Sequence, residues 1–380
     1  WVLSYAAFDR AVDAAASALR AKGIAPGEHV GIGLGDRPEH LAWLFGAARC
    51  GAVFVPIDCR WTAPEKARVC SSFGVKLLVH DEGAGAPGLP ALRVAADWAE
   101  RCGTDAVPHS APGGEAPLAI YLSSGTTGQP KGPVLTHANM AARFDMYRRH
   151  LGLGAADRFA CVTPLYFSAS RGFAMCILHA GGTVVQLSLP MPAGELAGAI
   201  QAARCTSAAL VPTLIRRLLD EPAGAGHRLP GLRTLISTGA PLNPHERAEA
   251  LARLSPHLHT FYGSSEGGGV SVLAPSDPPG RADSAGRIVP GTAVRIVDEA
   301  GRELAPGATG RIAYRSAATA GAFHGDTAAG AQALQDGWFY PGDLGRIEDG
   351  FVYITGREKD MIIRGGENVY PEEIERVLRT

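Results

Sequence analysis

The feature that most constrains the fold of this chain is an alternation between helix-like and strand-like segments. Apolar residues recur at helical spacing from Tyr5 to Leu19, where Ser4 is placed to cap the start of a helix and Gly23 to end it. The alternation continues with strand-like segments at residues 29–34, 52–55, 159–162, 183–187, 208–211 and 234–236, and helix-like segments at residues 38–48, 172–180, 193–203 and 214–219. Such a pattern predicts an α/β protein with mostly parallel sheets that helices cover on both faces.

Two stretches depart from this alternation. Residues 82–116 are rich in Gly, Ala and Pro around one short helix, and we interpret them as a variable surface excursion. From about residue 276 the pattern changes to short strands separated by turns, at residues 293–297, 310–315 and 350–354. This change predicts a small antiparallel unit, with the form of a distorted β-barrel. A final amphipathic helix is expected from Pro371 onward.

Charge and apolar content exclude several functional classes. The chain has 36 basic and 37 acidic side chains and a net charge of −1, so it lacks a broad basic field that could hold nucleic acid or an anionic membrane. No apolar run reaches the ~18 residues of a membrane span. The 7 cysteines form no CxxC pair and are odd in number. We therefore interpret them as reduced core thiols of a cytoplasmic protein.

The strongest local signal is the segment YLSSGTTGQPKGPVLTH, residues 121–137, which follows the strand-like residues 118–122. Its hydroxyl side chains, glycines and lysine are Ser123, Ser124, Gly125, Thr126, Thr127, Gly128 and Lys131. Glycine lets the backbone approach an anion closely, hydroxyls and amides donate to phosphate oxygens, and lysine adds a positive charge. The segment is not a Walker loop, because only two residues separate Gly125 from Gly128 and Gly132 follows the lysine. We predict a phosphate-binding loop.

This segment closely resembles the phosphate loop of the adenylate-forming superfamily, which includes acyl-CoA synthetases, peptide-synthetase adenylation domains and luciferases. Further motifs of that superfamily stand in the same order along the chain: RCGAVFVPID at residues 49–58, STGAPL at 237–242, FYGSSEGG at 261–268, GWFYPGDLG at 337–345 and GREKDMIIRGGENVYPEEIE at 356–375. One departure is Ser265, which stands where the superfamily usually has threonine. The resemblance covers essentially the whole chain.

The resemblance implies a particular domain organisation. Residues 1–356 would form a large N-terminal AMP-binding domain of two helix-covered sheets, with the β-barrel subdomain at about 276–355. Residues 357–359 would be the hinge, with Lys359 as the hinge residue, and residues 360–380 would begin an α+β C-terminal domain that is either truncated or not seen in full. The superfamily's lysine that contacts the carboxylate and α-phosphate would lie further along, so we expect a 380-residue form to bind ATP and AMP but to form adenylate poorly.

The resemblance also assigns roles to individual residues. Lys131 and Glu266 would be catalytic, and Glu266 would be the Mg²⁺ ligand beside the phosphates. The ring of Tyr262 can stack on adenine, Asp343 would accept from the ribose hydroxyls, and Arg357 would contact ribose or phosphate. The remaining nucleotide contacts would come from Gly239, Ala240, Pro241, Gly263 and Ser265.

The implied reaction is a two-step ligation that uses ATP, Mg²⁺ and a thiol. A carboxylate attacks the α-phosphorus of ATP to give an acyl adenylate and pyrophosphate, and the thiol then displaces AMP to leave a thioester. Lys359 at the hinge and the sequence GGENVYPEEIE resemble acyl-CoA ligases, which favours coenzyme A as the thiol. Three alternatives stay open: an adenylation domain that loads an acyl carrier protein, a luciferase-like oxygenase, and a nucleotide-binding homologue without catalytic activity.

The segment TPLYFSASRGF, residues 163–173, indicates the kind of acid. Relatives that activate α-amino acids have an aspartate that pairs with the substrate ammonium, and here Ser168 stands in its place. A buried ammonium facing Ser168 would lack a countercharge, so we predict an uncharged apolar acid, aryl or alicyclic ahead of medium-chain. We expect Phe167 to form one apolar wall, and the glycines at 267–269 to leave space or flexibility at a second. The predicted pocket consists of Phe167, Ser168, Thr238, Gly267 and Gly268. The alternative is that Ser168 lies outside the pocket.

Overall fold

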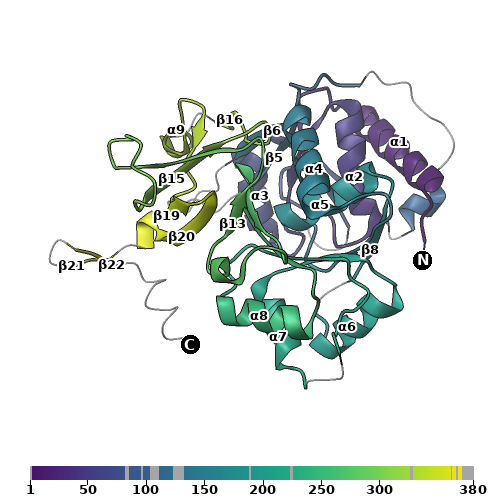
Figure 1. The fold of residues 1–380 in the computed structure, drawn as a ribbon. Coiled ribbons are helices and arrows are strands. Elements are labelled where there is room, and N and C mark those ends of the chain that lie inside the picture. Colours follow the sequence, from purple (N-terminus) through teal and green to yellow (C-terminus); the bar gives the residue numbers. More distant parts are fainter. Residues whose placement is uncertain are drawn as a thin grey trace. The chain divides into compact units, whose positions relative to one another are not determined.

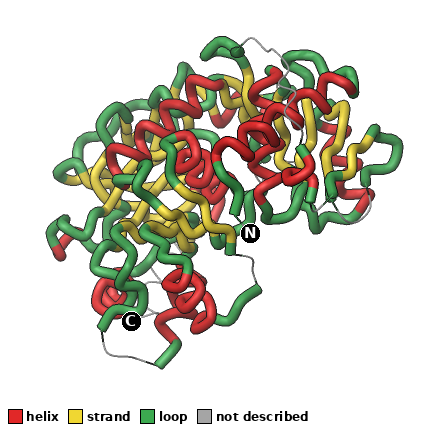
Figure 2. The backbone as a smooth tube through the Cα atoms, turned by 90° about the vertical axis from the view of Figure 1, so that its right-hand side faces the viewer, coloured by secondary structure: helices red, strands yellow, loops and turns green. Residues whose placement is uncertain are grey.

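The computed structural model describes residues 2–81, 85–95, 97–102, 111–122, 132–187, 190–222, 226–325, 328–360, 362–364 and 367–369. The chain divides into two compact units. Unit 1 comprises Trp1–Ala141, Pro164–Arg171 and Ala320–Gly330, and unit 2 comprises Ala142–Thr163, Gly172–Thr319 and Ala331–Thr380. Helices and strands alternate along the backbone, in red and yellow in Figure 2. The predicted α/β class is confirmed.

Unit 1 is built around a sheet in which seven strands are described. These strands are β1 (His29–Gly33), β2 (Val53–Pro56), β3 (Val75–His80), β4 (Ala91–Arg93), β5 (Pro117–Ile120), β6 (Pro133–Thr136) and β16 (Ala322–Phe323). Their order is β16-β6-β5-β2-β1-β3-β4, with parallel pairing from β5 to β4, while β6 is antiparallel to both β5 and β16. The first helices of the chain are α1 (Tyr5–Ala21), α2 (Pro38–Cys50) and α3 (Ala63–Ser72), and a 3₁₀ turn lies at Trp98–Arg101.

The stretch at residues 82–116 differs from the surface excursion that we expected, because it contains β4. This strand pairs in parallel with β3, for example through Val79 and Leu92, and forms the edge of the sheet. A strand of three residues is too short to show the alternation on which a sequence prediction depends. The stretch therefore belongs in part to the sheet of unit 1.

Local signals set the ends of the first two helices. The hydroxyl of Ser4 accepts a hydrogen bond from the backbone N–H of Ala7 at 3.3 Å and so caps α1, as predicted. Helix α2 begins at Pro38 and ends before Gly51, whose φ of 76° is the left-handed conformation that glycine adopts most easily. The two helices pack so closely that a Cβ added at Gly46 would lie 2.5 Å from the Cβ of Ala15. Glycine at position 46 is therefore a packing requirement.

Unit 2 is built around a second sheet, in which thirteen strands are described. The strands that come first along the chain are β7 (Arg158–Cys161), β8 (Thr183–Gln186), β9 (Ser207–Leu210), β10 (Thr234–Thr238), β11 (Leu258–Ser264) and β12 (Gly268–Leu273). The later strands are β13 (Gly286–Ile288), β14 (Ala293–Val297), β15 (Gly310–Arg315), β17 (Leu334–Gln335), β18 (Trp338–Phe339), β19 (Asp343–Glu348) and β20 (Phe351–Arg357). The order β8-β7-β9-β10-β11 is parallel, and an antiparallel part follows from β12 onward.

The antiparallel strands predicted after about residue 276 are present. They are continuous with the parallel part of the sheet, because β13 pairs with β12 on one side and with β20 on the other. Beyond β20 the order is β19-β15-β18-β17, and β14 pairs with β15. A short two-stranded ribbon, β21 (Ile362–Arg364) with β22 (Glu367–Val369), follows the 3₁₀ turn Glu358–Asp360.

The remaining helices are α4 (His137–Leu151), α5 (Ser168–His179), α6 (Ala193–Ala202), α7 (Pro212–Asp220), α8 (Pro244–Arg253) and α9 (Ala328–Ala333), labelled in Figure 1 where there is room. Helix α5 begins four residues before its predicted start at Gly172. The predicted boundary followed the apolar pattern, whereas the first turn is polar and is closed by the hydrogen bond from Arg171 N–H to the carbonyl of Phe167.

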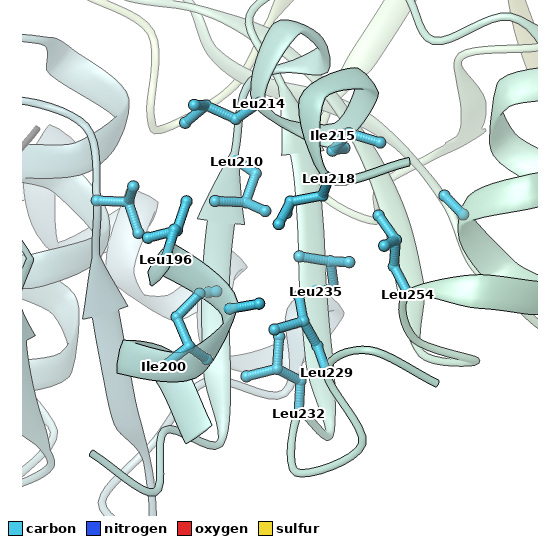
Figure 3. Packing of buried hydrophobic residues seen from close by; sticks show 14 of the residues in the cluster. Leu196, Ile200, Leu210, Leu214, Ile215, Leu218, Leu229, Leu232, Leu235 and Leu254 are labelled. Carbon is cyan, nitrogen blue, oxygen red and sulfur yellow. The ribbon is translucent and has the colours of Figure 1, made fainter. Parts of the chain in front are cut away.

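A large apolar cluster holds the parallel strands of unit 2 against their helices. Figure 3 shows leucine and isoleucine side chains of α6 and α7 pointing toward those of β9 and β10. The labelled members are Leu196, Ile200, Leu210, Leu214, Ile215, Leu218, Leu229, Leu232, Leu235 and Leu254. Burying each such side chain contributes about 1.5–3 kcal/mol, so this core fixes the strands from whose ends the next loops emerge.

Two further predictions concern the chain as a whole. Each of the seven cysteines is a free thiol, as we expected from their number and spacing. In the described part of the chain, no helix combines the length and the apolar character needed to cross a membrane. The predicted helix from Pro371 lies outside the described residues, and the domain boundaries at 356 and 360 stay a prediction.

Candidate active site

Loops after the parallel strands of unit 2 carry many of the predicted nucleotide contacts. Strand β10 ends at the buried Thr238 and is followed by three exposed residues, Gly239, Ala240 and Pro241. Strand β11 contains Tyr262 and Gly263 and is followed by Ser265 and Glu266. The two strands are parallel neighbours, with Thr238 beside Phe261, so their carboxyl ends share one edge of the sheet. α/β proteins commonly bind ligands at that edge.

Asp343, Tyr262 and Arg357 come together within unit 2. Asp343 begins β19 and is paired in register with Arg357 at the end of β20. The hydroxyl of Tyr262 donates to Asp343 Oδ2 at 2.7 Å, and Arg357 Nε lies 3.3 Å from Asp343 Oδ1. The structure therefore assembles three residues that the sequence placed 95 positions apart at most, between Tyr262 and Arg357.

The surroundings of Tyr262 keep its hydroxyl protonated. Burial, followed by the nearby Asp343 carboxylate, raises the pKa of Tyr262 well above its ordinary value, so the phenol stays a neutral donor. The Asp343 carboxylate has room for about four hydrogen bonds. Two protein donors orient it, and lone pairs remain to accept from a diol such as that of ribose.

The backbone that carries Glu266 is fixed on several sides. The Ser264 hydroxyl accepts from the N–H of Gly267 at 2.8 Å and forms a hydrogen bond with the hydroxyl of Tyr314 at 2.9 Å. The Thr319 hydroxyl donates to the carbonyl of Gly267 at 3.2 Å. Burial, ahead of the other causes, raises the pKa of Tyr314, which stays protonated in this cluster. The loop therefore presents Glu266 from a rigid backbone.

The carboxylate of Glu266 is half-buried and available. It forms neither a hydrogen bond nor an ion pair with any residue that the structure describes. The described residues also contain no group of three or more His, Cys, Asp or Glu side chains that could hold a metal ion by themselves. A single unpaired carboxylate fits Mg²⁺, which typically takes one or two carboxylates and completes its shell with phosphate oxygens and water.

The glycines after Glu266 correct one expectation. We expected Gly267, Gly268 and Gly269 to leave space or flexibility, and the structure shows that no free space lies in their Cβ directions, which atoms of unit 2 fill. A Cβ at Gly267 would overlap the Tyr314 ring, and one at Gly268 would lie 2.8 Å from the Cβ of Ala318. These glycines allow close packing within the unit. Whether Gly267 and Gly268 also border the acid stays a prediction.

Residues 164–171 of the predicted acid-binding segment lie in unit 1, and Arg171 holds their backbone in place. This buried guanidinium donates to the carbonyls of Leu165 at 2.9 Å and Tyr166 at 2.8 Å, and lies 4.2 Å from the ring centroid of Tyr121. Phe167 is 52% exposed, which leaves an apolar ring available for contact. Ser168 begins α5.

A polar group borders this segment. Arg60 forms a bidentate pair with Asp58, at 3.0 and 2.8 Å, and donates to the Tyr166 hydroxyl. Burial and then the Asp58 carboxylate raise the pKa of Tyr166 to about 12. The rings of Tyr166 and Phe167 lie 4.4 Å apart, so the fixed tyrosine positions its neighbour. Sequence reasoning missed this group, because its members are far apart along the chain.

Some predicted site residues lie outside the described residues, and one lies in an exposed turn. Residues 123–131, which include all seven predicted phosphate-loop contacts from Ser123 to Lys131, lie outside the described residues. The strands that flank them, β5 and β6, are antiparallel partners. Lys359 is exposed in the 3₁₀ turn after β20. Their functional roles stay predictions.

Comparisons with known proteins agree with this arrangement. Residues 2–324 match the family model described as AMP-binding enzyme. The indoleacetate–CoA ligase of Aromatoleum aromaticum is 35% identical, over 99% of this chain and 78% of its own length. The fatty acid–[acyl-carrier-protein] ligase ScoC of Streptomyces coeruleorubidus is 34% identical, over 99% of this chain and 76% of its own. The ATP-bound structure of MatB from Rhodopseudomonas palustris has a TM-score of 0.87 at 27% identity, covering 98% of this chain and 77% of that one.

The two sheets, the order of the motifs and the trio around Asp343 define an adenylate-forming enzyme. The chain belongs to the AMP-binding enzyme family. Within that family it is an acid–thiol ligase of the acyl-CoA synthetase class, the class that uses ATP and coenzyme A.

Proposed function

We propose that this protein activates an apolar carboxylic acid, aryl or alicyclic ahead of medium-chain, as its acyl adenylate and transfers the acyl group to coenzyme A. The observation that carries the proposal is the Glu266 carboxylate, which has no partner among the described residues and stands on a hydrogen-bonded loop after β11, in the same unit as the Asp343 trio. In the first step an acid oxygen bonds to the α-phosphorus and pyrophosphate leaves. In the second a thiolate bonds to the acyl carbon and AMP leaves.

Each described residue would contribute by binding or orientation. Asp343, aligned by Tyr262 and Arg357, would accept from the ribose hydroxyls. Glu266 would hold Mg²⁺ against the phosphates. When bound, the ion supplies neutralisation of the charge on the phosphate oxygens. The exposed turn at Gly239 would border the adenine. Such positioning and charge stabilisation account for most of the catalysis in phosphoryl chemistry.

The nature of the acid is supported by the segment around Phe167. Its exposed ring offers an apolar contact, and Ser168 supplies no charge opposite an ammonium. The relative that acts on indoleacetate, an aryl-substituted acid, supports the same preference. The free thiols support a reducing compartment, so we propose that the protein acts in the cytoplasm.

A second candidate acceptor is an acyl carrier protein, because one relative is a ligase of that kind. The acceptor is tested by incubating the full-length protein with ATP, Mg²⁺ and benzoate, and with either coenzyme A or a holo-carrier protein. We expect mass spectrometry to detect benzoyl-CoA formed faster than acylated carrier. Acylation of the carrier alone would assign the second function, and nucleotide binding without either thioester would indicate a non-catalytic homologue.

A further inference from the structure

A buried arginine outside every predicted motif binds the Glu266 loop directly. Arg143 lies in α4 and is 4% exposed. Its Nη1 donates to the carbonyl of Ser265 and its Nη2 to the carbonyl of Glu266, both at 3.0 Å. Its Nε donates to the carbonyl of Ala318, also at 3.0 Å. One planar group thus joins three backbone carbonyls.

The third carbonyl connects the guanidinium to the other side of the same loop. Ala318 belongs to the turn after β15, and the neighbouring Thr319 donates to the carbonyl of Gly267 at 3.2 Å. The Cβ of Ala318 also fills the space beside Gly268. Arg143 therefore fixes Ser265 and Glu266 directly and holds in place the turn on which the next two residues pack.

The planar shape of the arginine side chain explains why its hydrogen bonds fix the orientation of the backbone at Ser265 and Glu266. A guanidinium holds its five N–H donors in one rigid plane, whereas a lysine ammonium is a point donor on a flexible stem. Because one rigid guanidinium binds the carbonyls of two successive residues, it fixes the orientation of the peptide group between them. That peptide contains the nitrogen of Glu266, so its orientation governs where the carboxylate points.

We propose that Arg143 is a positioning residue that aims the Glu266 carboxylate at the metal of MgATP. This inference rests on the proposed function, in which Glu266 is the metal ligand. Loss of the guanidinium frees the 265–266 peptide to rotate, and the carboxylate then samples directions in which it does not meet the ion. Metal affinity falls, while the ribose contacts at Asp343 stay intact.

Arg247 offers a matched control in the same unit. It is also 4% exposed, and it donates to the Thr260 hydroxyl at 2.9 Å and to the carbonyls of Leu258, Leu273 and Ala274 at 3.1–3.3 Å. These contacts join the start of β11 to the end of β12, away from the Glu266 loop. Loss of either arginine removes a buried, carbonyl-binding charge, but only Arg143 touches the proposed metal ligand.

The test uses the full-length protein and the variants R143K, R143Q, R247K and Glu266→Gln. Mn²⁺ titration in the presence of α,β-methylene-ATP, followed by electron paramagnetic resonance, measures metal affinity without turnover. Pyrophosphate exchange then gives the KM for Mg²⁺ separately from kcat. For R143K we expect at least tenfold weaker Mn²⁺ binding and a raised KM for Mg²⁺. Affinity for the metal-free nucleotide should stay within twofold, and R247K should bind Mn²⁺ as the wild type does.

Unchanged Mn²⁺ affinity in a folded R143K or R143Q, or an equal loss in R247K, would overturn the proposal. Failure of both Arg143 variants to fold while R247K folds would also overturn it, because the role would then be structural. Failure of the proposed function looks different: the wild type itself would show no acid-dependent exchange, or Glu266→Gln would retain normal metal binding.

Discussion

Single buried arginines hold segments of this enzyme's backbone in place. Arg143, Arg171 and Arg247 are each buried, and the guanidinium of each donates hydrogen bonds to backbone carbonyls. Burial lowers the pKa of Arg247 to about 10, which still leaves it charged at neutral pH. A buried charge is costly unless hydrogen bonds satisfy it. Each arginine therefore stabilises one arrangement of its loop and disfavours others.

We predict that a substitution at Glu266 lowers activity without changing stability. Since its carboxylate has no partner among the described residues, Glu266→Gln should leave the thermal unfolding midpoint unchanged. Acid-dependent pyrophosphate exchange should fall by on the order of a hundredfold or more, as is usual when a charge-stabilising group is lost. The exposed Glu299 provides a control, because Glu299→Gln should preserve both properties. Exchange within threefold of the wild type in Glu266→Gln would show that another group binds the metal.

At His40 we predict a pH-dependent loss of stability. Burial, with Arg171 as a smaller cause, lowers the pKa of His40 from 6.5 to about 4, and its Nδ1 lies 2.9 Å from the carbonyl of Leu34. The unfolded chain binds the proton more tightly, so stability is complete above pH 6.5 and declines as the pH falls toward 4. His40→Asn keeps a donor but does not titrate.

The measurement for His40 is denaturant unfolding at pH 7 and pH 5. Between these values the wild type should lose about 2 kcal/mol more unfolding free energy than His40→Asn, a difference that follows from the two pKa values. Equal losses in the two proteins would mean that His40 does not contribute to the pH dependence.

At the scale of elements, alanine substitutions at two helical glycines should change the free energy of unfolding in opposite directions. A Cβ at Gly46 in α2 would meet the Cβ of Ala15 at 2.5 Å, whereas one at Gly198 in α6 would meet nothing within 4 Å. Gly198→Ala should therefore stabilise by up to about 1 kcal/mol through helix propensity. Gly46→Ala should destabilise by about 1–2 kcal/mol, since overpacking outweighs propensity.

Chemical denaturation of both glycine variants checks this prediction. Adding Ala15→Gly to Gly46→Ala should recover part of the loss, because it removes the nearest of the atoms that the new methyl group meets. Stabilisation by Gly46→Ala would mean that α1 and α2 are not in close contact.

Sequence periodicity predicted many of the elements, and tertiary contacts account for what it missed. Strands β14 and β15 have the predicted bounds, because turn residues flank both of them. Strand β4 was too short to carry a signal, and the polar first turn of α5 did not continue the apolar pattern. These boundaries depend on neighbours that no local pattern contains.

Sequence patterns are limited in the same way at the candidate active site, because they do not contain contacts between remote residues. Motifs in the superfamily's order predicted Asp343 and Tyr262, and the structure joins them by a hydrogen bond. Sequence reasoning missed Arg143. This residue lies at helical spacing from Met140 and Tyr147, which are buried, and a charged residue on the apolar face of a helix is a signal that could have found it. Gly267 lies in the turn between β11 and β12 and packs against Tyr314 of β15, which is remote in sequence, so the sequence suggested open space instead.

For the whole molecule, the predicted site residues are distributed over both units. Glu266 and the Asp343 trio belong to unit 2, whereas the segment of Phe167 belongs to unit 1. The predicted pocket also includes Thr238, Gly267 and Gly268, which belong to unit 2. Substitutions at Phe167 should change which acid is used, while substitutions at Asp343 should change the KM for ATP.

The most direct test of the central claim is acid-dependent ATP–pyrophosphate exchange by the full-length protein across a panel of acids. The panel contains benzoate, phenylacetate, cyclohexanecarboxylate, hexanoate and phenylalanine. We predict the fastest exchange with the aryl and alicyclic acids, slower exchange with hexanoate, and roughly a thousandfold lower selectivity for phenylalanine, whose ammonium would lack a countercharge. Exchange that is absent with every acid, or fastest with phenylalanine, would contradict the account.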